Sequence, residues 1–512
     1  MPLAVILGMA LAFLLDAGIP LKSELRSCFL TPLMVPTASI VLIWQVLFDY
    51  NGVVNVAVQK FGGGQVDWLK SSAGLLVIIL LFLWKNLGYN MILFLSAMGN
   101  IPKDIIEVAE LDGANRWQIF LHVKLRYLSP TIMFVTILSM INSFKVFREI
   151  YLLTGEYPYG ALYIFAAALY EQYVCFGRLP ETFHGSNLYV LCDDRHYGNF
   201  ILGGTSFWKG FGGRMKKRSE RKKLCIRICL TVIAVVTALI FIMPIVLTIS
   251  NSFMSAAEIT SNYGSIFQKT DTGGKQYISQ TVNLKFIPDM VTFSQYATVL
   301  FKSPDYLLKF WNSVILVVPI VVFQLVVAVL AAYGFTRTRG KLSAIVFFAY
   351  VILMMMPYQV TLVPNYLVLN WMKLLDTNWS IWLPGIFSPF SVYLITKYMR
   401  RIPVPLIEAA KIDGANEFQV FTKICIPICK GVITTCAILV FMDYWNMVEQ
   451  PLLFFNDTDK YPLSIFLSKI NAQEVGLAFA VATFYMIPSL LIFLYGEDQL
   501  VEGIAYQGGV KG

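Results

Sequence analysis

Long apolar stretches separated by short polar segments dominate the chain. A helix needs about 20 largely apolar residues to cross a bilayer. The stretches that reach or approach this length are 29–48, 73–96, 131–152, 228–250, 308–333, 344–366, 379–398, 431–449 and 475–496. A shorter apolar run, Pro2 to Ala17, is expected to be part of a truncated crossing. The pattern predicts an all-α protein, a polytopic transmembrane helical bundle.

Basic residues orient these crossings, because Lys and Arg concentrate in the loops on the cytoplasmic side. Nine of them lie between Lys209 and Arg227, against the single acid Glu220. Further basic residues mark 337–341 and 397–430, whereas 251–307 is long, polar and mixed in charge. We therefore expect 251–307 outside the cell and the basic segments inside. With this assignment the crossings of the second half alternate consistently.

The first half is less regular. The segment 97–130 carries four basic residues and is expected inside, so the crossing at 131–152 leads the chain outside. The chain must then return, yet 177–200 holds five charged residues, each costing several kcal/mol near a bilayer centre. A frameshift or a fusion scar there is a hypothesis that the coding DNA would test. The predicted parts are a first half at 1–176 lacking its last crossing, an atypical junction at 177–223, and a second half with six crossings at 224–512.

Composition excludes several other classes of protein. Of the 512 residues, 57% are hydrophobic and 14% are charged, against roughly a quarter charged in soluble proteins. The net charge of +9 resides in short segments between apolar stretches, so we expect no nucleic-acid partner. The eight cysteines are expected to be free thiols. No metal site is predicted, although His184, Cys192 and His196 form one cluster of weak ligand character.

The chain also lacks the usual signs of catalysis. It contains no G-x-x-x-x-G-K-[ST] phosphate-binding loop and only three histidines. We therefore predict no catalytic residues and no cofactor bound by this chain. Any ATP would be hydrolysed by another polypeptide.

The most specific feature is an internal repeat at an offset of 301 residues. IPKDIIEVAELDGANRWQIF at 101–120 matches IPVPLIEAAKIDGANEFQVF at 402–421, and eleven of the twenty positions are identical. Both copies lie in polar segments, where shared hydrophobicity cannot produce a match. Because both are expected inside, the repeats are parallel and imply a pseudo-two-fold axis along the membrane normal.

Each copy predicts a short helix, a turn and a second short helix. Pro102 and Pro403 suit the first turn of a helix, where a missing N–H is tolerated. The Asp-Gly pairs at 112–113 and 413–414 are expected to end that helix, because glycine accepts the left-handed conformation there. A plain surface hairpin would explain one copy, but not two matched ones.

The second copy resembles the EAA loop of ABC importer permeases. Residues 408–410 read Glu-Ala-Ala, Gly414 follows after three residues, and 424–427 read Ile-x-Ile-Pro. The first copy is similar but has Val108 for the second alanine and Arg126 where proline is expected. In that family the loop docks into a cleft of the ATPase subunit and transmits its closure. The resemblance implies this coupling role for Glu107, Ala109, Asp112, Gly113, Glu408, Ala409, Ala410, Asp413 and Gly414.

Flanking sequence narrows the resemblance to carbohydrate importers. The segment 362–390 and the C-terminal residues resemble the second permease of such systems, whereas 29–48 and 160–166 resemble the first. The resemblance covers nearly the whole chain except 177–208. It implies a type I-like bundle of two permease repeats in the plasma membrane of a bacterium. The implied partners are a cytoplasmic ABC ATPase dimer that binds ATP and Mg²⁺, an extracytoplasmic solute-binding protein, membrane lipid and a sugar-like substrate.

Polar residues inside crossings are candidates for the solute path. Those that follow each repeat copy combine aromatic faces with hydrogen-bonding groups, which suits a sugar ring. They are Asn142, Phe144, Lys145, Asp443, Trp445, Asn446 and Glu449. The alternative is that they mark the outer interface, where Trp and Tyr concentrate. The sequence favours neither interpretation.

Two other functions remain open at this stage. An ion-coupled secondary carrier would need ionisable residues deep in its crossings and no matched docking loops. An inactive fused permease is the third hypothesis, because the first half is irregular. Binding of a cognate ATPase would distinguish the leading hypothesis from both.

Overall fold

The computed structural model describes residues 1–155, 220–267, 282–338, 340–356, 358–468 and 475–508. Within these ranges the chain forms helices and connecting segments and no β-strand. The all-α fold is confirmed. The predicted junction at 177–223 and the cluster of His184, Cys192 and His196 lie outside the described residues, apart from the first turn of a helix that begins at Glu220.

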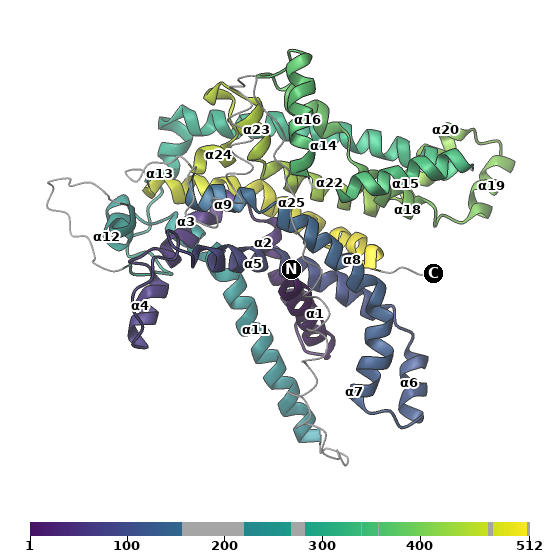
Figure 1. Cartoon of the computed structure of the whole chain (residues 1–512), viewed down its shortest axis with the longest axis horizontal. Coiled ribbons are helices and arrows are strands. Elements are labelled where there is room, and N and C mark those ends of the chain that lie inside the picture. Colours follow the sequence, from purple (N-terminus) through teal and green to yellow (C-terminus); the bar gives the residue numbers. More distant parts are fainter. Residues whose placement is uncertain (156–219, 268–281, 339, 357, 469–474, 509–512) are drawn as a thin grey trace, which may run out of the picture.

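The helices before the junction lead from the N-terminus to the end of the first half (Figure 1). They are α1 (Pro2–Asp16), α2 (Lys22–Met34), α3 (Thr37–Phe48), α4 (Val53–Lys60), α5 (Gly74–Gly99), α6 (Lys103–Leu111), α7 (Arg116–Gln118), the π-helix Ile119–Lys124, α8 (Leu125–Phe144) and α9 (Phe147–Thr154).

The second half begins with the long helix α11 and ends with the long helix α25. Its helices are α11 (Glu220–Asn251), α12 (Ala256–Phe267), α13 (Ser294–Ala297), the π-helix Thr298–Lys302, α14 (Pro304–Arg337), α15 (Lys341–Met355), α16 (Tyr358–Trp371), α17 (Trp379–Ile386), α18 (Pro389–Met399), α19 (Val404–Ile412), α20 (Glu417–Val420), the π-helix Phe421–Cys425, α21 (Ile426–Ile428), α22 (Lys430–Trp445), α23 (Glu449–Phe454), the 3₁₀ turn Thr458–Lys460, α24 (Leu463–Ser468) and α25 (Val475–Gly508).

Six described helices are long and apolar enough to cross a membrane: Thr37–Lys60, Gly74–Gly99, Ile119–Ser143, Arg227–Asn251, Pro304–Arg337 and Leu477–Leu500. A seventh crossing is reached if Glu417–Ile428 and Lys430–Trp445, which meet at 71°, are one bent span. The chain is therefore a multi-spanning membrane protein, as the hydrophobic pattern predicted.

Several predicted crossings are not single helices. The stretch 29–48 divides into α2 and α3, which meet at Val35 and Pro36, because proline lacks the N–H that would continue the helix. The stretch 379–398 likewise divides, and α18 starts at Pro389. The stretches 131–152 and 344–366 are each built from two helices, α8 with α9 and α15 with α16. Two of these stretches, 344–366 and 379–398, contain no described helix that is long and apolar enough to cross a membrane by itself.

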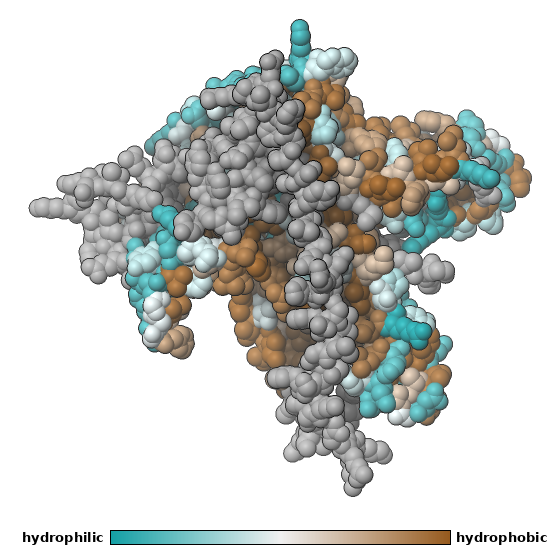
Figure 2. Space-filling view, viewed as in Figure 1, coloured by the Kyte–Doolittle hydropathy of each residue, from teal (hydrophilic) through white to brown (hydrophobic). Residues whose placement is uncertain are grey.

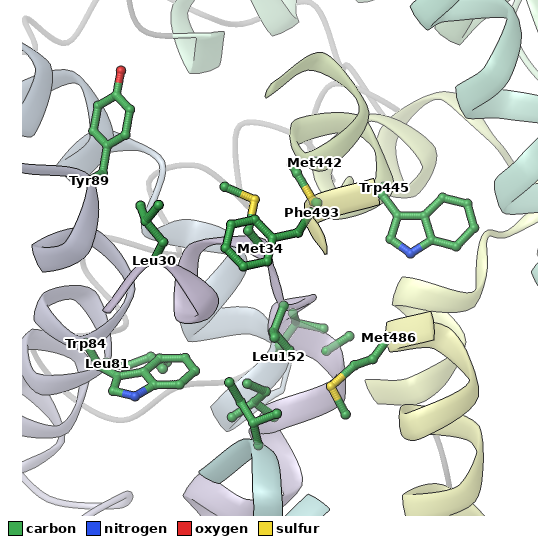
Figure 3. Packing of buried hydrophobic residues seen from close by; sticks show 14 of the residues in the cluster. Leu30, Met34, Leu81, Trp84, Tyr89, Leu152, Met442, Trp445, Met486 and Phe493 are labelled. Carbon is green, nitrogen blue, oxygen red and sulfur yellow. The ribbon is translucent and has the colours of Figure 1, made fainter. Parts of the chain in front are cut away.

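One apolar core joins the two halves. Buried side chains of α2, α5 and α9 converge on those of α22 and α25 (Figure 3). Examples shown there are Leu30, Met34, Trp84, Leu152, Met442 and Phe493. Close packing of α2 on α5 depends on Gly88, since a Cβ there would lie 1.9 Å from the carbonyl oxygen of Phe29. Small residues at helix contacts are how membrane bundles bring backbones together.

The two repeat copies project from the same side of the molecule. In Figure 1, α6 with α7 and α19 with α20 lie at the right, whereas α4 and α12 lie at the left. Hydrophilic side chains gather over both projections, and hydrophobic ones over the helices that lead to them (Figure 2). The repeats are therefore parallel, as predicted.

Candidate functional site

The two projections, here called the first elbow (101–124) and the second elbow (402–425), share one local geometry. Helices α6 and α19 end at Leu111 and Ile412, and Asp112 and Asp413 are their C-caps. The following glycines are left-handed, with φ of +79° at Gly113 and +86° at Gly414. This agrees with the sequence prediction and explains the glycine, since other residues are strained in that conformation. Pro102 and Pro403 lie one position before the first turn, as N-caps, rather than within it.

A capping box that the sequence analysis missed starts the second helix of each elbow. The backbone N–H of Asn416 donates to Oε1 of Gln419 (2.9 Å), and the N–H of Gln419 donates to Oδ1 of Asn416 (2.8 Å). Asn115 and Gln118 make the same two bonds, at 2.8 and 2.9 Å. The signal was available, because an Asn three residues before a Gln is a helix-start pattern.

Aromatic contacts connect each elbow to an earlier helix of its own half. Phe120 packs edge-on against Phe13 of α1, with ring centroids 5.1 Å apart. At the equivalent position, Phe421 packs against Tyr333 of α14 at 4.8 Å. Each elbow is therefore packed directly against another helix of its own half.

Charged contacts reinforce both connections. Lys124 of the first elbow lies 3.6 Å from Asp16 of α1. In the second elbow Glu417 accepts a hydrogen bond from the Tyr333 hydroxyl (2.6 Å), lies 3.5 Å from Arg337 and pairs with Lys411. The side chain of Glu417 is 56% exposed, so each of these pairs contributes only modestly to stability.

The tips of the elbows expose matched apolar side chains. Leu111 and Ile412 occupy equivalent repeat positions and are 86% and 85% exposed. Trp117 and Phe418 are a second equivalent pair, 51% and 72% exposed. The predicted coupling residues Glu107, Asp112, Gly113, Glu408, Ala409, Asp413 and Gly414 are also exposed, whereas Ala109 and Ala410 are half-buried. Each elbow therefore presents a small apolar surface bordered by acidic residues.

A cluster of ionised groups, here called the inter-half charge cluster, joins the two halves inside the bundle. Arg148 of α9 lies 3.5 Å from Glu449 of α23 and 3.9 Å from Asp443 of α22. Lys145 lies 3.6 Å from Asp443. Arg148 and Glu449 are both buried, and they occupy equivalent positions of the repeat, 301 residues apart.

Two members of this cluster were not predicted from sequence. Lys85 of α5 donates to Oε1 of Glu149 (2.8 Å) and to the hydroxyl of Thr37 (2.7 Å). The backbone N–H of Thr37 in turn donates to Oδ1 of Asn446 (2.9 Å). Lys85 could have been noticed, because a lysine within an apolar crossing requires a partner.

The predicted solute-path residues are divided by the fold. Lys145 and Asp443 keep side-chain exposures of 35% and 53%. Trp445, Asn446 and Glu449 are buried, and Trp445 stacks between Phe441 and Tyr485 at 5.0 Å each. Asn142 is half-buried, and its amide donates to Oδ1 of Asn86 (3.3 Å). Of Phe144, the structure describes the backbone at the end of α8 and no side chain. No group of three His, Cys, Asp or Glu that could hold a metal occurs among the described residues.

Parallel repeats, several crossings and paired elbows define a helical membrane transport component. Residues 4–173 and 290–500 match the family described as "Binding-protein-dependent transport system inner membrane component". The chain belongs to this family, which also establishes its place in the cell membrane.

The two relatives described here are similar over 41% and 56% of the chain. The lactose transport system permease protein LacG of Rhizobium radiobacter is 30% identical over 214 residues, 41% of this chain and 78% of that protein. The arabinooligosaccharides transport system permease protein AraQ of Bacillus subtilis is 25% identical over 289 residues, 56% of this chain and 96% of that protein.

A solved structure is similar at a lower level. It is described as a bacterial ABC transporter involved in the import of the acidic polysaccharide alginate. It is 22% identical, with a TM-score of 0.46, and covers 56% of this chain and 99% of its own.

Proposed function

We propose that the chain is the transmembrane permease of an ATP-driven importer that moves a sugar or a related solute into the cytoplasm. The family assignment supports a transport role, and relatives named for lactose and arabinooligosaccharides support a carbohydrate. The observation that carries the proposal is the pair of elbows with matched, exposed apolar tips, Leu111 with Ile412 and Trp117 with Phe418. Two equivalent surfaces suit a partner that is itself a two-fold dimer.

The proposed mechanism is alternating access driven from the elbows. Closure of a cytoplasmic ATPase dimer draws the two elbows together. The contacts of Phe120 with Phe13 and of Phe421 with Tyr333 pass this displacement to α1 and α14. The two halves then rock about their shared core, and the solute, delivered by an extracytoplasmic binding protein, gains access from one side and then from the other.

Lys145 and Asp443 are the proposed contacts for the solute. Both retain exposure between the halves, and together they offer a donor and an acceptor for hydroxyl groups. The buried Arg148, which lies 3.9 Å from Asp443 and 3.5 Å from Glu449, positions Asp443 of this pair. Release of the solute follows when rocking separates the two halves.

The elbow tips provide the test. The full chain is co-expressed with its cognate ATPase, and Leu111→Glu and Ile412→Glu are each compared with Leu342→Glu, which changes an equally exposed leucine at the start of α15 (75% exposed). We expect each tip variant to weaken co-purification about tenfold, equivalent to about 1.4 kcal/mol, and to reduce uptake. Full association of both tip variants would contradict the proposal.

The inter-half charge cluster favours one alternative, an ion-coupled secondary carrier. Buried ionisable groups such as Lys85, Glu149 and Arg148 are the means by which carriers couple to protons. Vesicle uptake distinguishes the two functions: the importer requires internal ATP and tolerates an uncoupler, whereas the carrier has the opposite requirements. Absence of uptake under both conditions would identify an inactive fused permease.

A further inference from the structure

A segment at the end of the molecule opposite the elbows exposes large apolar side chains. It connects α12 to α14 and comprises residues 284–302. Six of its side chains, here called the apolar collar, are between 53% and 84% exposed: Phe286, Ile287, Met290, Val291, Phe293 and Phe301. Contiguous apolar surface of this kind marks a binding or membrane surface rather than a solvated loop.

The other side of the same segment is firmly held by the protein. Val299 is 1% exposed within the core, and Gln295 is buried with its amide donating to the carbonyl of Met254. The hydroxyls of Tyr296 and Ser252 lie 2.6 Å apart. The segment is therefore amphipathic in the sense that one side packs on protein and the other presents hydrocarbon. Its exposure does not result from loose attachment.

Contacts with α11 determine where the collar lies along the membrane normal. The N–H of Thr292 donates to the carbonyl of Phe253 (2.9 Å), and the Phe253 ring lies 5.5 Å from that of Phe293. Phe253 is two residues beyond Asn251, where α11 ends. The collar thus lies at the end of an apolar crossing, which is the level of the lipid headgroups and the first acyl carbons.

The collar also continues the lipid-facing surface of α11. Leu239 and Val246 on that helix are 63% and 43% exposed. One turn beyond Val246, on the same face, the hydroxyl of Ser250 donates to the carbonyl oxygen of Phe286. Phe286 is therefore placed over the row of side chains that faces lipid.

The charged side chains near the collar do not oppose contact between the collar and lipid. Lys285 pairs with Asp289, and Glu258 accepts a bond from the N–H of Asp289 (2.8 Å). Lys302, beside Phe301, is exposed and available to a lipid phosphate.

We propose that the apolar collar is a lipid-binding surface that inserts into the outer leaflet and fixes the outer ends of α11 and α14. Segments of this kind bury their apolar side about 5–10 Å into the boundary between headgroups and acyl chains. The partner is the bilayer itself, and its recognition is hydrophobic, with Lys302 contributing to phosphate groups.

The test measures which medium covers the collar. In the full chain with its eight cysteines replaced, single cysteines are introduced by Ile287→Cys and Phe301→Cys, by Asn283→Cys as a polar control in the same segment, and by Leu239→Cys as a lipid-facing control. Each is labelled with a fluorophore in lipid nanodiscs and exposed to nitroxide lipids and to aqueous iodide. We expect positions 287 and 301 to behave like 239, with several-fold stronger quenching by nitroxide lipid than at 283 and little quenching by iodide. Strong iodide quenching at 287 and 301, equal to that at 283, would overturn the proposal and leave this face for a soluble partner.

The native chain offers a second measurement without any substitution. Met290 and Met372 both lie near the outer ends of helices, and Met290 is the more exposed, 72% against 47%. If lipid covers the collar, we expect hydroxyl radicals to label Met290 more slowly than Met372 in nanodiscs, although Met290 is the more exposed in the protein alone. Faster labelling of Met290 would contradict it.

Discussion

The two halves of the chain carry the same elbow but hold it differently. The first elbow runs into α8 as one continuous helix, Ile119–Ser143, whereas the second meets α22 at 71°. The sequences differ at several positions here, among them Arg126 against Pro427 and Pro130 against Gly431. Proline removes an i to i−4 hydrogen bond and disturbs the preceding turn. We therefore infer that Pro427 contributes to the bend of the second elbow, whereas the helix of the first elbow continues past its own Pro130.

The second elbow is also better buried. Ile407, Val420 and Cys425 lie in a hydrophobic cluster with residues of α14 and α18. No residue of α6 in the first elbow is fully buried among those described. The shared motif therefore fixes the local turn, while the neighbouring helices determine how firmly the elbow is held.

In the inter-half charge cluster the two halves carry opposite charges, Arg148 in the first and Glu449 in the second. Removing one of these charges is expected to give the largest loss of stability. Glu449→Gln leaves the buried Arg148 without its 3.5 Å partner, and loss of one partner from a buried pair costs about 3–5 kcal/mol. We expect a lower unfolding midpoint in nanodiscs. Asp443→Asn, at a site with 53% side-chain exposure, is the milder control. The exchange of Arg148→Glu with Glu449→Arg should recover part of the loss, and equal damage in the exchange would show that pairing is not the cause.

Arg126→Pro would give the first elbow the proline of the second. Proline in a helix interior costs about 3 kcal/mol, and the continuous helix Ile119–Ser143 should bend or lose stability. Thermal unfolding measures the cost, with Arg126→Ala as the control for lost charge. If Arg126→Pro and Arg126→Ala have the same midpoint, the bend of the second elbow has another origin.

The difference in burial between the two elbows should produce a smaller difference in stability between equivalent variants. Ile407 is 7% exposed, so Ile407→Ala is expected to cost about 2 kcal/mol or more. Ile106, its repeat equivalent, is half-buried, and Ile106→Ala should cost less than half as much. Chemical unfolding of both variants in the same detergent gives the ratio. Equal costs would mean that the first elbow is covered as well as the second.

The smallest effect is expected at the exposed charges of the second elbow. Glu417→Gln removes the pairs with Lys411 and Arg337, and exposed pairs contribute about 0–1 kcal/mol. We expect the free energy of unfolding to change little. We also expect it to depend less on ionic strength in Glu417→Gln than in the unchanged protein. Ala415→Ser serves as a neutral control on the same turn. A large loss of stability would show that Glu417 is more than a surface contact.

The sequence predicted the elbows well because their information is local. Gly113, Gly414 and the repeat itself lie in polar segments, where a match cannot arise from hydrophobicity. Their left-handed conformation follows from glycine alone. The same reasoning gave the class of fold and the positions of most apolar crossings.

The inter-half charge cluster was predicted only in part because its information is not local. Lys85 and Glu149 are 64 residues apart, and no pattern in the chain pairs them. Trp445 was grouped with solute contacts for its aromatic face, but that face stacks between Phe441 and Tyr485, and its N–H donates to the carbonyl of Tyr485 (3.2 Å) inside the core. Which side of an apolar helix faces a partner depends on packing that hydropathy does not report.

The opposite charges at one pair of repeat positions have a consequence for assembly. Two first halves placed about the same axis would bring Arg148 against a second arginine, and two second halves would bring Glu449 against a second glutamate. Buried like charges are repelled by several kcal/mol. By this electrostatic argument, the pair favours the mixed arrangement of the two halves over two copies of either half.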